Sequence, residues 1–147
     1  KNKKSGAAGL FQIMPQYFID YGVDKSTVWN PYINAEAATK KMVKRLKSIN
    51  KIINPADRDN IGAYIYMAHQ QGLGGFQTVY TACNKYSNLN AEQALISAAA
   101  DYNRSPSFGR TVFRNMKANG PDSPCRFINQ WIKKYNRNLN KIQKRMR

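Results

Sequence analysis

The sequence predicts an all-α fold in a single domain, on three observations. Apolar residues recur at intervals of three and four along most of the chain, which is the spacing of one helix face. No segment alternates apolar and polar residues over a convincing length, as a half-buried strand would. The chain has 147 residues, 42% of them hydrophobic, which suits one domain with its own core. We find no internal repeat, low-complexity linker or domain boundary.

The N-terminal third contains two expected helices. The first runs from Pro15 to Tyr21, because proline suits the first helical position and Gly22 can close the last turn. The second is expected to begin at Asn34, which can act as its N-cap. The apolar residues that place this second helix at helical spacing are Ala38, Met42, Val43, Leu46 and Ile49.

The middle of the chain predicts four more helical segments. Pro55 and Asp57 open a helix that ends at Gly72, with an apolar stripe typical of a central helix. The segment 74–86 is expected to be helical despite its Thr and Val residues. Asn90 caps a further helix over 91–103, and Pro106 or Ser107 begins the next one.

The last helix, residues 124–147, is predicted to be basic and amphipathic. Its apolar residues lie on one stripe, which we expect to pack as core. Residues 126 to 147 carry eight Lys and Arg residues and no acidic residue. The stripe consists of Ile128, Trp131, Ile132, Tyr135, Leu139, Ile142 and Met146.

The charge of the chain predicts an anionic partner. The chain has 24 Lys and Arg against 8 Asp and Glu, a net charge of +16. A nucleic acid, an acidic lipid surface and a bacterial wall polymer all fit this charge. The charge alone does not choose among them.

The two cysteines leave two redox states open. Cys83 and Cys125 can form a disulfide in an oxidising compartment, or remain buried as free thiols. Buried free cysteines are common, which favours the reduced pair. The wide separation of the two residues gives no metal-ligand spacing.

Several kinds of catalytic chemistry find no support in the residues. With His69 as the only histidine, a His-rich metal site is excluded, and any Ser-His-Asp arrangement would depend on that residue. No phosphate-binding loop or dinucleotide fingerprint is present, and the Gly72–Gly75 run is best interpreted as a turn between helices. We expect no metal and no cofactor.

The carboxylates do not identify a general acid. Nearly all of them lie at expected helix starts or in loops, where capping a helix or interacting with its dipole is the ordinary role. They are Asp20, Asp24, Glu36, Asp57, Asp59, Glu92, Asp101 and Asp122. We therefore name no catalytic residue within the chain.

Two motifs in the first half of the chain carry a family resemblance. The stretch "GAAGLFQIMP", Gly6 to Pro15, resembles the G-A-x-G-L-x-Q-[IL]-M-P motif of soluble lytic transglycosylases and goose-type lysozymes. The stretch "AHQQGLGG", Ala68 to Gly75, stands where that family has A-Y-N-A-G-P-G. Its His-Gln-Gln form resembles the variant found in bacteriophage wall-degrading proteins. Between them, "NPYINAEAATKKM" is similar to the N-P-x-x-N-I-x-A-G helix start of the family.

The small residues of the first motif have a physical use of their own. The run from Gly6 to Gly9 has almost no side-chain volume, so its backbone can approach either a sugar or a neighbouring helix closely. Leu10, Ile13 and Met14 can anchor the segment in a core, while Gln12 offers a donor and an acceptor to an amino sugar. A structural hydrogen bond is the alternative for Gln12.

The resemblance implies a lysozyme-like fold and a lytic transglycosylase. Such enzymes cleave the β-1,4 bond between N-acetylmuramic acid and N-acetylglucosamine and close a 1,6-anhydro ring on the muramic acid, using one Glu as acid and then base. The family places that Glu about a dozen residues before the first motif, which is upstream of Lys1 in this sequence. The substrate-binding residues that the resemblance implies are Gln12, Ile13, Met14, His69, Gln70 and Gly72.

The resemblance also implies partners and a place of action. We expect peptidoglycan glycan strands as the substrate, met outside the cytoplasm by a virion-associated, periplasmic or secreted protein, within a larger virion or secretion assembly. The basic C-terminal helix would add an anionic wall polymer or a nucleic acid. The alternative is an inactive glycan-binding module, or one that binds nucleic acid or membrane through the basic surface.

Overall fold

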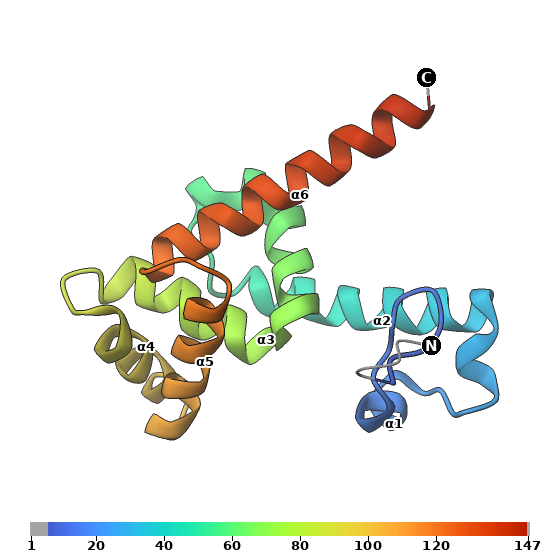
Figure 1. The fold of residues 1–147 in the computed structure, drawn as a ribbon, viewed down its shortest axis with the longest axis horizontal. Coiled ribbons are helices and arrows are strands. Elements are labelled where there is room, and N and C mark those ends of the chain that lie inside the picture. The colour runs from blue at the N-terminus through green and yellow to red at the C-terminus, as the bar shows by residue number, and fades with distance from the viewer. Residues whose placement is uncertain (1–5, 147) are drawn as a thin grey trace. The chain divides into compact units, whose positions relative to one another are not determined.

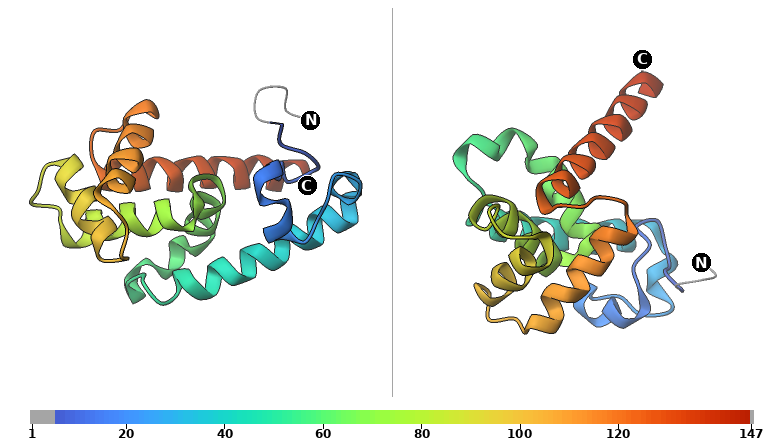
Figure 2. Two further views of the ribbon diagram at one scale, coloured as in Figure 1. Left: turned by 90° about the horizontal axis from the view of Figure 1, so that it is seen from below. Right: turned by 60° about the vertical axis from the view of Figure 1, so that its left-hand side comes forward.

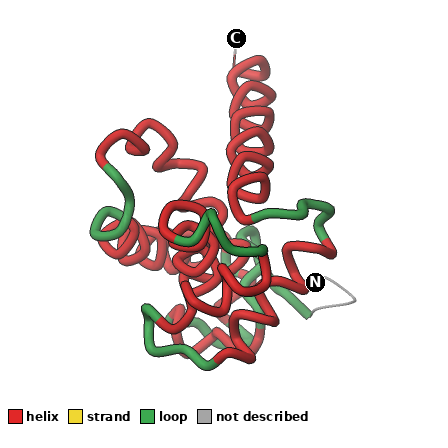
Figure 3. Tube along the Cα trace, turned by 90° about the vertical axis from the view of Figure 1, so that its left-hand side faces the viewer, coloured by secondary structure: helices red, strands yellow, loops and turns green. Residues whose placement is uncertain are grey.

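A computed structural model of the chain describes residues 6–146, and within this range it contains helices and loops without a β-strand (Figure 3). The predicted all-α class is confirmed. Ser5 and Arg147, the last residue of the predicted basic helix, lie outside the described residues. The acid that the resemblance places upstream of Lys1 also lies outside them. The chain divides into two compact units, Lys1–Lys47 and Ser48–Arg147, and each is described by itself.

The first unit packs short helices and a loop against a long helix. Its elements are η1 (Pro15–Tyr17), α1 (Phe18–Tyr21), η2 (Thr27–Trp29) and most of α2 (Pro31–Ile49). The expected short helix over 15–21 is present as η1 followed directly by α1, and Gly22 ends it in the left-handed conformation at φ 65°. The core of this unit contains the buried residues Ala8, Ile13, Val23, Val28 and Ala37.

The start of α2 corrects the expected N-cap. The Asn30 side-chain oxygen accepts the backbone N–H groups of Tyr32 and Ile33 at 3.0 and 3.2 Å, so Asn30 caps the helix. Asn34 lies in the first turns of the helix and is fully buried. The prediction of Asn34 as cap was wrong because its amide bonds a neighbouring loop instead of its own helix.

The second unit contains one interrupted long helix and three others (Figure 1). After η3 (Pro55–Asn60) comes α3 (Ile61–Lys85), in which Gly72 adopts φ 76° and ψ 152° and breaks the helical path. Both the predicted end at Gly72 and the predicted helix after it are confirmed. The remaining helices are α4 (Ala91–Ala100), capped by Asn90 as predicted, α5 (Pro106–Ala118) and α6 (Pro124–Met146).

The core of the second unit is built on α3. Buried side chains from α3, α4, α5 and α6 form one continuous cluster, in which Phe76, Leu95, Met116 and Phe127 are almost fully shielded. Cys83 at the end of α3 and Cys125 at the start of α6 form a disulfide with the two Cα atoms 4.9 Å apart. Of the two redox states left open, the structure contains the disulfide and not the favoured reduced pair, because the fold brings two distant cysteines to adjoining helix ends.

Only the first half of the apolar stripe of α6 becomes core. Ile128 and Trp131 are each 6% exposed. The Tyr135 hydroxyl packs so closely on Gly62 of α3 that a Cβ at this glycine would overlap it. From Leu139 onward the stripe is exposed, and Figures 1 and 2 show this end of α6 extending beyond α3, α4 and α5. The prediction that the whole stripe packs as core is wrong for this half. None of the helices in the range 6–146 has the length and apolar character required to cross a membrane.

Candidate functional site

The first motif folds into a closed turn. Ala8 and Ile13 exchange two backbone hydrogen bonds, with the Ala8 N–H to Ile13 oxygen distance 3.0 Å and the reverse distance 2.9 Å. Between Ala8 and Ile13, the Gln12 N–H donates to the Gly9 carbonyl at 3.2 Å, which makes residues 9–12 a β-turn. The motif is therefore a short two-sided loop with its tip formed by Leu10 and Phe11.

Gly9 is required for a structural reason. Its φ is 74°, and a Cβ at this position would overlap the amide of Asn34 and the carbonyl of Val28. The Asn34 oxygen accepts the Phe11 N–H at 2.8 Å, and its nitrogen donates to the Val28 carbonyl at 3.1 Å. Of the two uses considered for the small residues, close approach to a neighbouring helix is the one that Gly9 fulfils.

Gln12 presents its side chain at the surface of this turn. It is exposed and adopts φ 53°, which is uncommon for a residue other than glycine. Its amide nitrogen donates to the Gly9 carbonyl at 2.8 Å, so the side chain is held close to its own turn. Within residues 6–146 the amide oxygen of Gln12 has no hydrogen-bond donor, and it remains available to a ligand. The Gln12 side chain therefore makes a structural hydrogen bond through its nitrogen and keeps its oxygen as a free acceptor.

The other two predicted residues of this motif differ in exposure. Ile13 is only 3% exposed and packs among the core residues of the first unit, beneath the turn. Met14, which follows it, is half-buried and directly precedes η1. Ile13 thus supports the turn, while Gln12 and Met14 keep surface that a glycan could reach.

The second motif spans the interruption of α3, with residues 68–71 forming the last turn before Gly72 and residues 73–75 beginning the helix after it. Ala68 is fully buried, His69 is half-buried and Gln70 is exposed, whereas Gln71 and Gly72 are again half-buried. A Cβ on Gly72 would meet no atom within 4 Å, so its requirement for glycine comes from its backbone angles alone. This break turns the chain immediately after the polar pair His69 and Gln70.

Arg104 lies against the second motif, a contact that no sequence pattern predicted. Its Nη2 donates to the Gln77 side-chain oxygen at 2.8 Å, and a Cβ on Gly74 would stand 3.0 Å from the same nitrogen. The guanidinium carbon lies 5.2 and 5.1 Å from the ring centroids of Tyr102 and Phe108. A single Arg in a loop carries no spacing signal, so only the fold reveals that it fixes the start of the second half of α3.

Two carboxylates of the second unit, Asp57 and Asp101, have structural partners. Asp57 accepts the Tyr80 hydroxyl, and the Asn54 N–H donates to the same hydroxyl oxygen at 2.8 Å. Burial, and after it the hydrogen bond to Asp57, raise the pKa of Tyr80. The hydrogen bond from Lys85 is the main cause that lowers the pKa of Asp101.

The two glutamates do not have the properties of a general acid. Glu36 is exposed and pairs with Lys40 at 2.6 Å, and the hydrogen bond from that lysine lowers the pKa of Glu36. A general acid near neutral pH needs the opposite shift. Glu92 lies in the first turn of α4, where an acidic side chain favours the helix N-terminus. The described part of the chain also places no three His, Cys, Asp or Glu residues together as a metal site.

The two motifs lie in different units of the chain, the first in Lys1–Lys47 and the second in Ser48–Arg147. Each forms a turn with polar side chains at its surface and a glycine at a position where the backbone requires it.

The described helices, the glycine-rich turn with its exposed glutamine and the broken helix agree with the lysozyme-like fold that the resemblance implies. A family model for the transglycosylase SLT domain matches residues 1–122. The chain belongs to this family, whose members are enzymes that act on peptidoglycan outside the cytoplasm. No curated protein and no solved structure shows a significant match to the chain.

The extent of the match clarifies the organisation of the chain. It spans both compact units and ends at residue 122, two residues before α6 begins at Pro124. The match therefore includes residues of both units, and α6 begins after the last matched residue. The resemblance stated from the two motifs is confirmed at the level of the family.

Proposed function

We propose that this domain belongs to a lytic transglycosylase that cleaves the β-1,4 bond between N-acetylmuramic acid and N-acetylglucosamine and leaves a 1,6-anhydro product. The observation that carries the proposal is the first-motif turn, in which Gln12 holds an open amide oxygen at the surface. That oxygen can accept a hydrogen bond from an N-acetyl N–H or a sugar hydroxyl. Membership of the transglycosylase SLT family supports the same substrate.

The proposed glycan-binding residues come from both motifs and are Gln12, Met14, His69, Gln70 and Gly72. Ile13 supports the first-motif turn from the core. The exposed amide of Gln70 and the half-buried ring of His69 can bind sugar hydroxyl or N-acetyl groups. Gly72 directs the chain away after this pair. These residues bind and orient the substrate and transfer no proton in the proposed reaction.

The proposed proton donor is a Glu about a dozen residues before Gly6 in the full-length protein. In the reaction it protonates the oxygen of the glycosidic bond as the bond from muramic C1 to that oxygen breaks. The carboxylate then takes the proton of the muramic C6 hydroxyl, whose oxygen forms the new bond to C1. One carboxyl group thus gives and regains one proton, and no water is consumed.

The variant form of the second motif, with His69 and Gln70 in place of Tyr-Asn, supports a bacteriophage-type protein. In this proposal it degrades the wall as part of a virion or as a secreted protein, within a larger assembly. The net charge of +16 suits an anionic wall polymer.

The test compares the full-length protein with a Glu→Gln variant of the upstream residue on purified peptidoglycan. Mass spectrometry of the digest is expected to show 1,6-anhydro muropeptides from the full-length protein and none from the variant, while glycan binding is retained. The chain of residues 1–147 alone is expected to bind without releasing products. Release by this chain would place the acid elsewhere, and no release by the full-length protein would favour a glycan-binding module without activity.

A further inference from the structure

The last helix changes character halfway along its length. In its first half Phe127, Ile128 and Trp131 are at most 6% exposed and pack against the other helices of the second unit. In its second half Leu139, Ile142 and Met146 are 38%, 55% and 81% exposed. These three residues follow one another at intervals of three and four, so they lie on one side of the helix. The structure therefore leaves an aliphatic strip in water. The strip lies on the end of α6 that extends beyond the other helices of the second unit, and Figure 1 shows the path of this helix.

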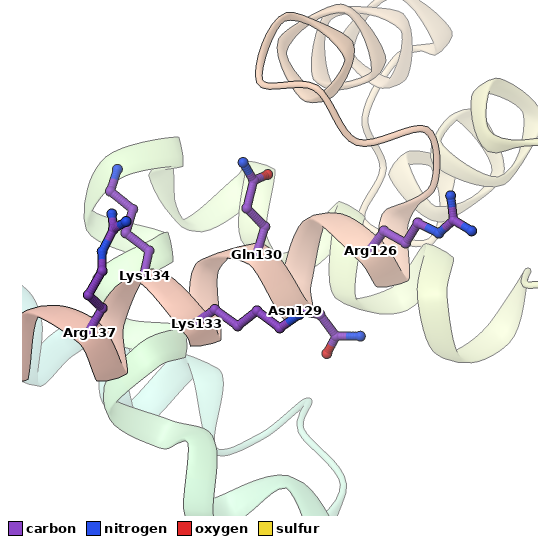
Figure 4. A pocket seen from close by; sticks show the side chains of 6 residues that line it. All are labelled: Arg126, Asn129, Gln130, Lys133, Lys134 and Arg137. Atoms are coloured by element: carbon purple, nitrogen blue, oxygen red, sulfur yellow. The ribbon is translucent and has the colours of Figure 1, made fainter.

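The rest of the α6 surface is cationic. Pro124–Met146 contains no acidic residue, and Figure 4 shows Arg126, Lys133, Lys134 and Arg137 along the helix together with Asn129 and Gln130. The cationic surface continues with Lys141, Lys144 and Arg145. Among the described residues, none of Lys133, Arg137, Lys141, Lys144 and Arg145 takes part in an ion pair. Their charge is uncompensated within the part of the chain that the structure describes.

Three kinds of occupant can be compared for this surface. A second copy of α6 could cover the aliphatic strip, but it would bring two helices of seven Lys and Arg residues each side by side, which is repulsive. A soluble polyanion would neutralise the cations and leave the strip in water. An anionic lipid surface satisfies both features, because aliphatic side chains enter the acyl boundary while cations are attracted to the headgroups.

We propose that the projecting half of α6, residues 135–146, binds the surface of an anionic phospholipid membrane. Leu139, Ile142 and Met146 face the acyl chains, and the helix lies in the plane of the interface. The cations on the far side still contribute, because a helix is about 10 Å across and the Debye length is about 8 Å at physiological ionic strength. Long Lys and Arg side chains also reach back toward the headgroups.

The position of α6 in the chain supports a role separate from cleavage of glycan. The family match ends at residue 122 and α6 begins at Pro124. The proposed glycan-binding residues all lie between Gln12 and Gly72, far from α6 in sequence. Membrane binding therefore goes beyond the proposed function, and either proposal can fail without the other.

The test measures flotation of the protein with vesicles. Vesicles of equal parts phosphatidylglycerol and phosphatidylcholine are compared with vesicles of phosphatidylcholine alone, and wild type is expected to float only with the first. The triple variant Leu139→Gln/Ile142→Gln/Met146→Gln is expected to bind at least about tenfold more weakly. Each of Lys141→Gln and Lys144→Gln should weaken binding by up to about fivefold.

Leu89→Gln is the matched control, because Leu89 lies outside α6 and is 37% exposed, close to the 38% of Leu139. It is expected to bind as wild type, and thermal unfolding should show that all variants remain folded. Unchanged binding of the triple variant would overturn the proposal in favour of a polyanion surface. Failure of wild type to float with the anionic vesicles would also overturn it. So would a wild-type dimer that the triple variant converts to a monomer, since a second copy would then cover the strip.

Discussion

The buried side chain of Asn34 holds the first-motif turn by accepting the backbone N–H of Phe11 at 2.8 Å. The same amide donates to the Val28 carbonyl at 3.1 Å, so one side chain from α2 links two separate loop segments. Gly9 lies directly over it, at a position where a Cβ would overlap the Asn34 amide. The glycine and the asparagine therefore depend on each other.

Asn34→Ala is expected to lower the free energy of unfolding by about 1–3 kcal/mol, because it leaves the part-buried N–H of Phe11 and the buried carbonyl of Val28 without partners. Chemical denaturation monitored by circular dichroism measures this. Asn140→Ala, at an exposed position of α6, is the control and should change stability little. Equal effects of the two substitutions would contradict the role given to Asn34.

Gly72→Asn is expected to be more destabilising than Gly22→Asn, although a Cβ meets no atom within 4 Å at either site. Gly22 has φ 65° and ψ 35°, a left-handed conformation that asparagine tolerates. Gly72 has φ 76° and ψ 152°, a region that is essentially restricted to glycine and costs other residues roughly 1–3 kcal/mol. Thermal unfolding of the two variants gives the comparison, and a larger loss at Gly22 would contradict the decisive role given to the backbone angles of Gly72.

Local signals in the sequence predicted the helices well, and tertiary contacts account for the differences. Helix starts are marked by residues whose own backbone or side chain favours the first turn, as at Pro15, Asn90 and Pro124. Such residues can be recognised in the sequence without knowing their tertiary contacts. Asn34 has the chemistry of a cap, yet it is buried inside α2, because the loop that it bonds lies more than 20 residues away in sequence. No local pattern encodes such a partner.

The candidate site shows the same division between local and tertiary information. Motif spacing identified Gln12 and Gln70, and both are exposed as a binding role requires. It could not distinguish Ile13, which is buried, from its neighbours in the motif. Arg104, held between two rings beside Gly74, was missed because its contacts join three separate segments. Likewise, an amphipathic stripe predicts a face for α6 without predicting how much of that face is covered.

Gln12→Ala and Gln70→Ala are each expected to weaken binding to glycan strands with little change in stability. Each removes hydrogen bonds worth about 0.5 to 1.5 kcal/mol apiece, and both residues are exposed. Sedimentation with insoluble peptidoglycan measures binding, and Gln93→Ala on α4 is the exposed control. Early melting with unchanged glycan affinity would instead make Gln12 and Gln70 structural residues.

The double variant Cys83→Ser/Cys125→Ser is expected to lose about 2–4 kcal/mol of unfolding free energy, since the disulfide joins residues separated by 42 positions. Reductant should destabilise wild type to a similar extent and leave the variant unchanged. Denaturant unfolding with and without a thiol reductant separates the two effects. A wild-type protein insensitive to reductant would be evidence against the bond.

Stability is expected to fall on acidification as Asp24 loses its charge. Hydrogen bonds from the Ser26 hydroxyl and the Thr27 and Ser26 N–H groups hold the pKa of Asp24 far below its ordinary value of 3.8. The unfolded chain then binds the proton more readily, so this contribution is complete above pH 3.8 and is lost as the pH falls below it. Asp24→Asn should lower the melting temperature at pH 6, and its difference from wild type should shrink toward pH 2.

Asp59→Asn is the control for this titration, because Asp59 is exposed and has no hydrogen bond among the described residues. It should melt close to wild type across the same pH range. A constant difference between Asp24→Asn and wild type at every pH would rule out titration of Asp24 as the cause.

The bond between Cys83 and Cys125 turns residues 83–125 into a covalent ring that contains α4 and α5. A protease that cuts the exposed segment 87–90 would open the ring without dividing the molecule. The two pieces would migrate together on a gel until a thiol is added, and until then α6 would remain covalently attached to α3. The polypeptide can therefore lose its continuity at this loop and keep its central helix pair.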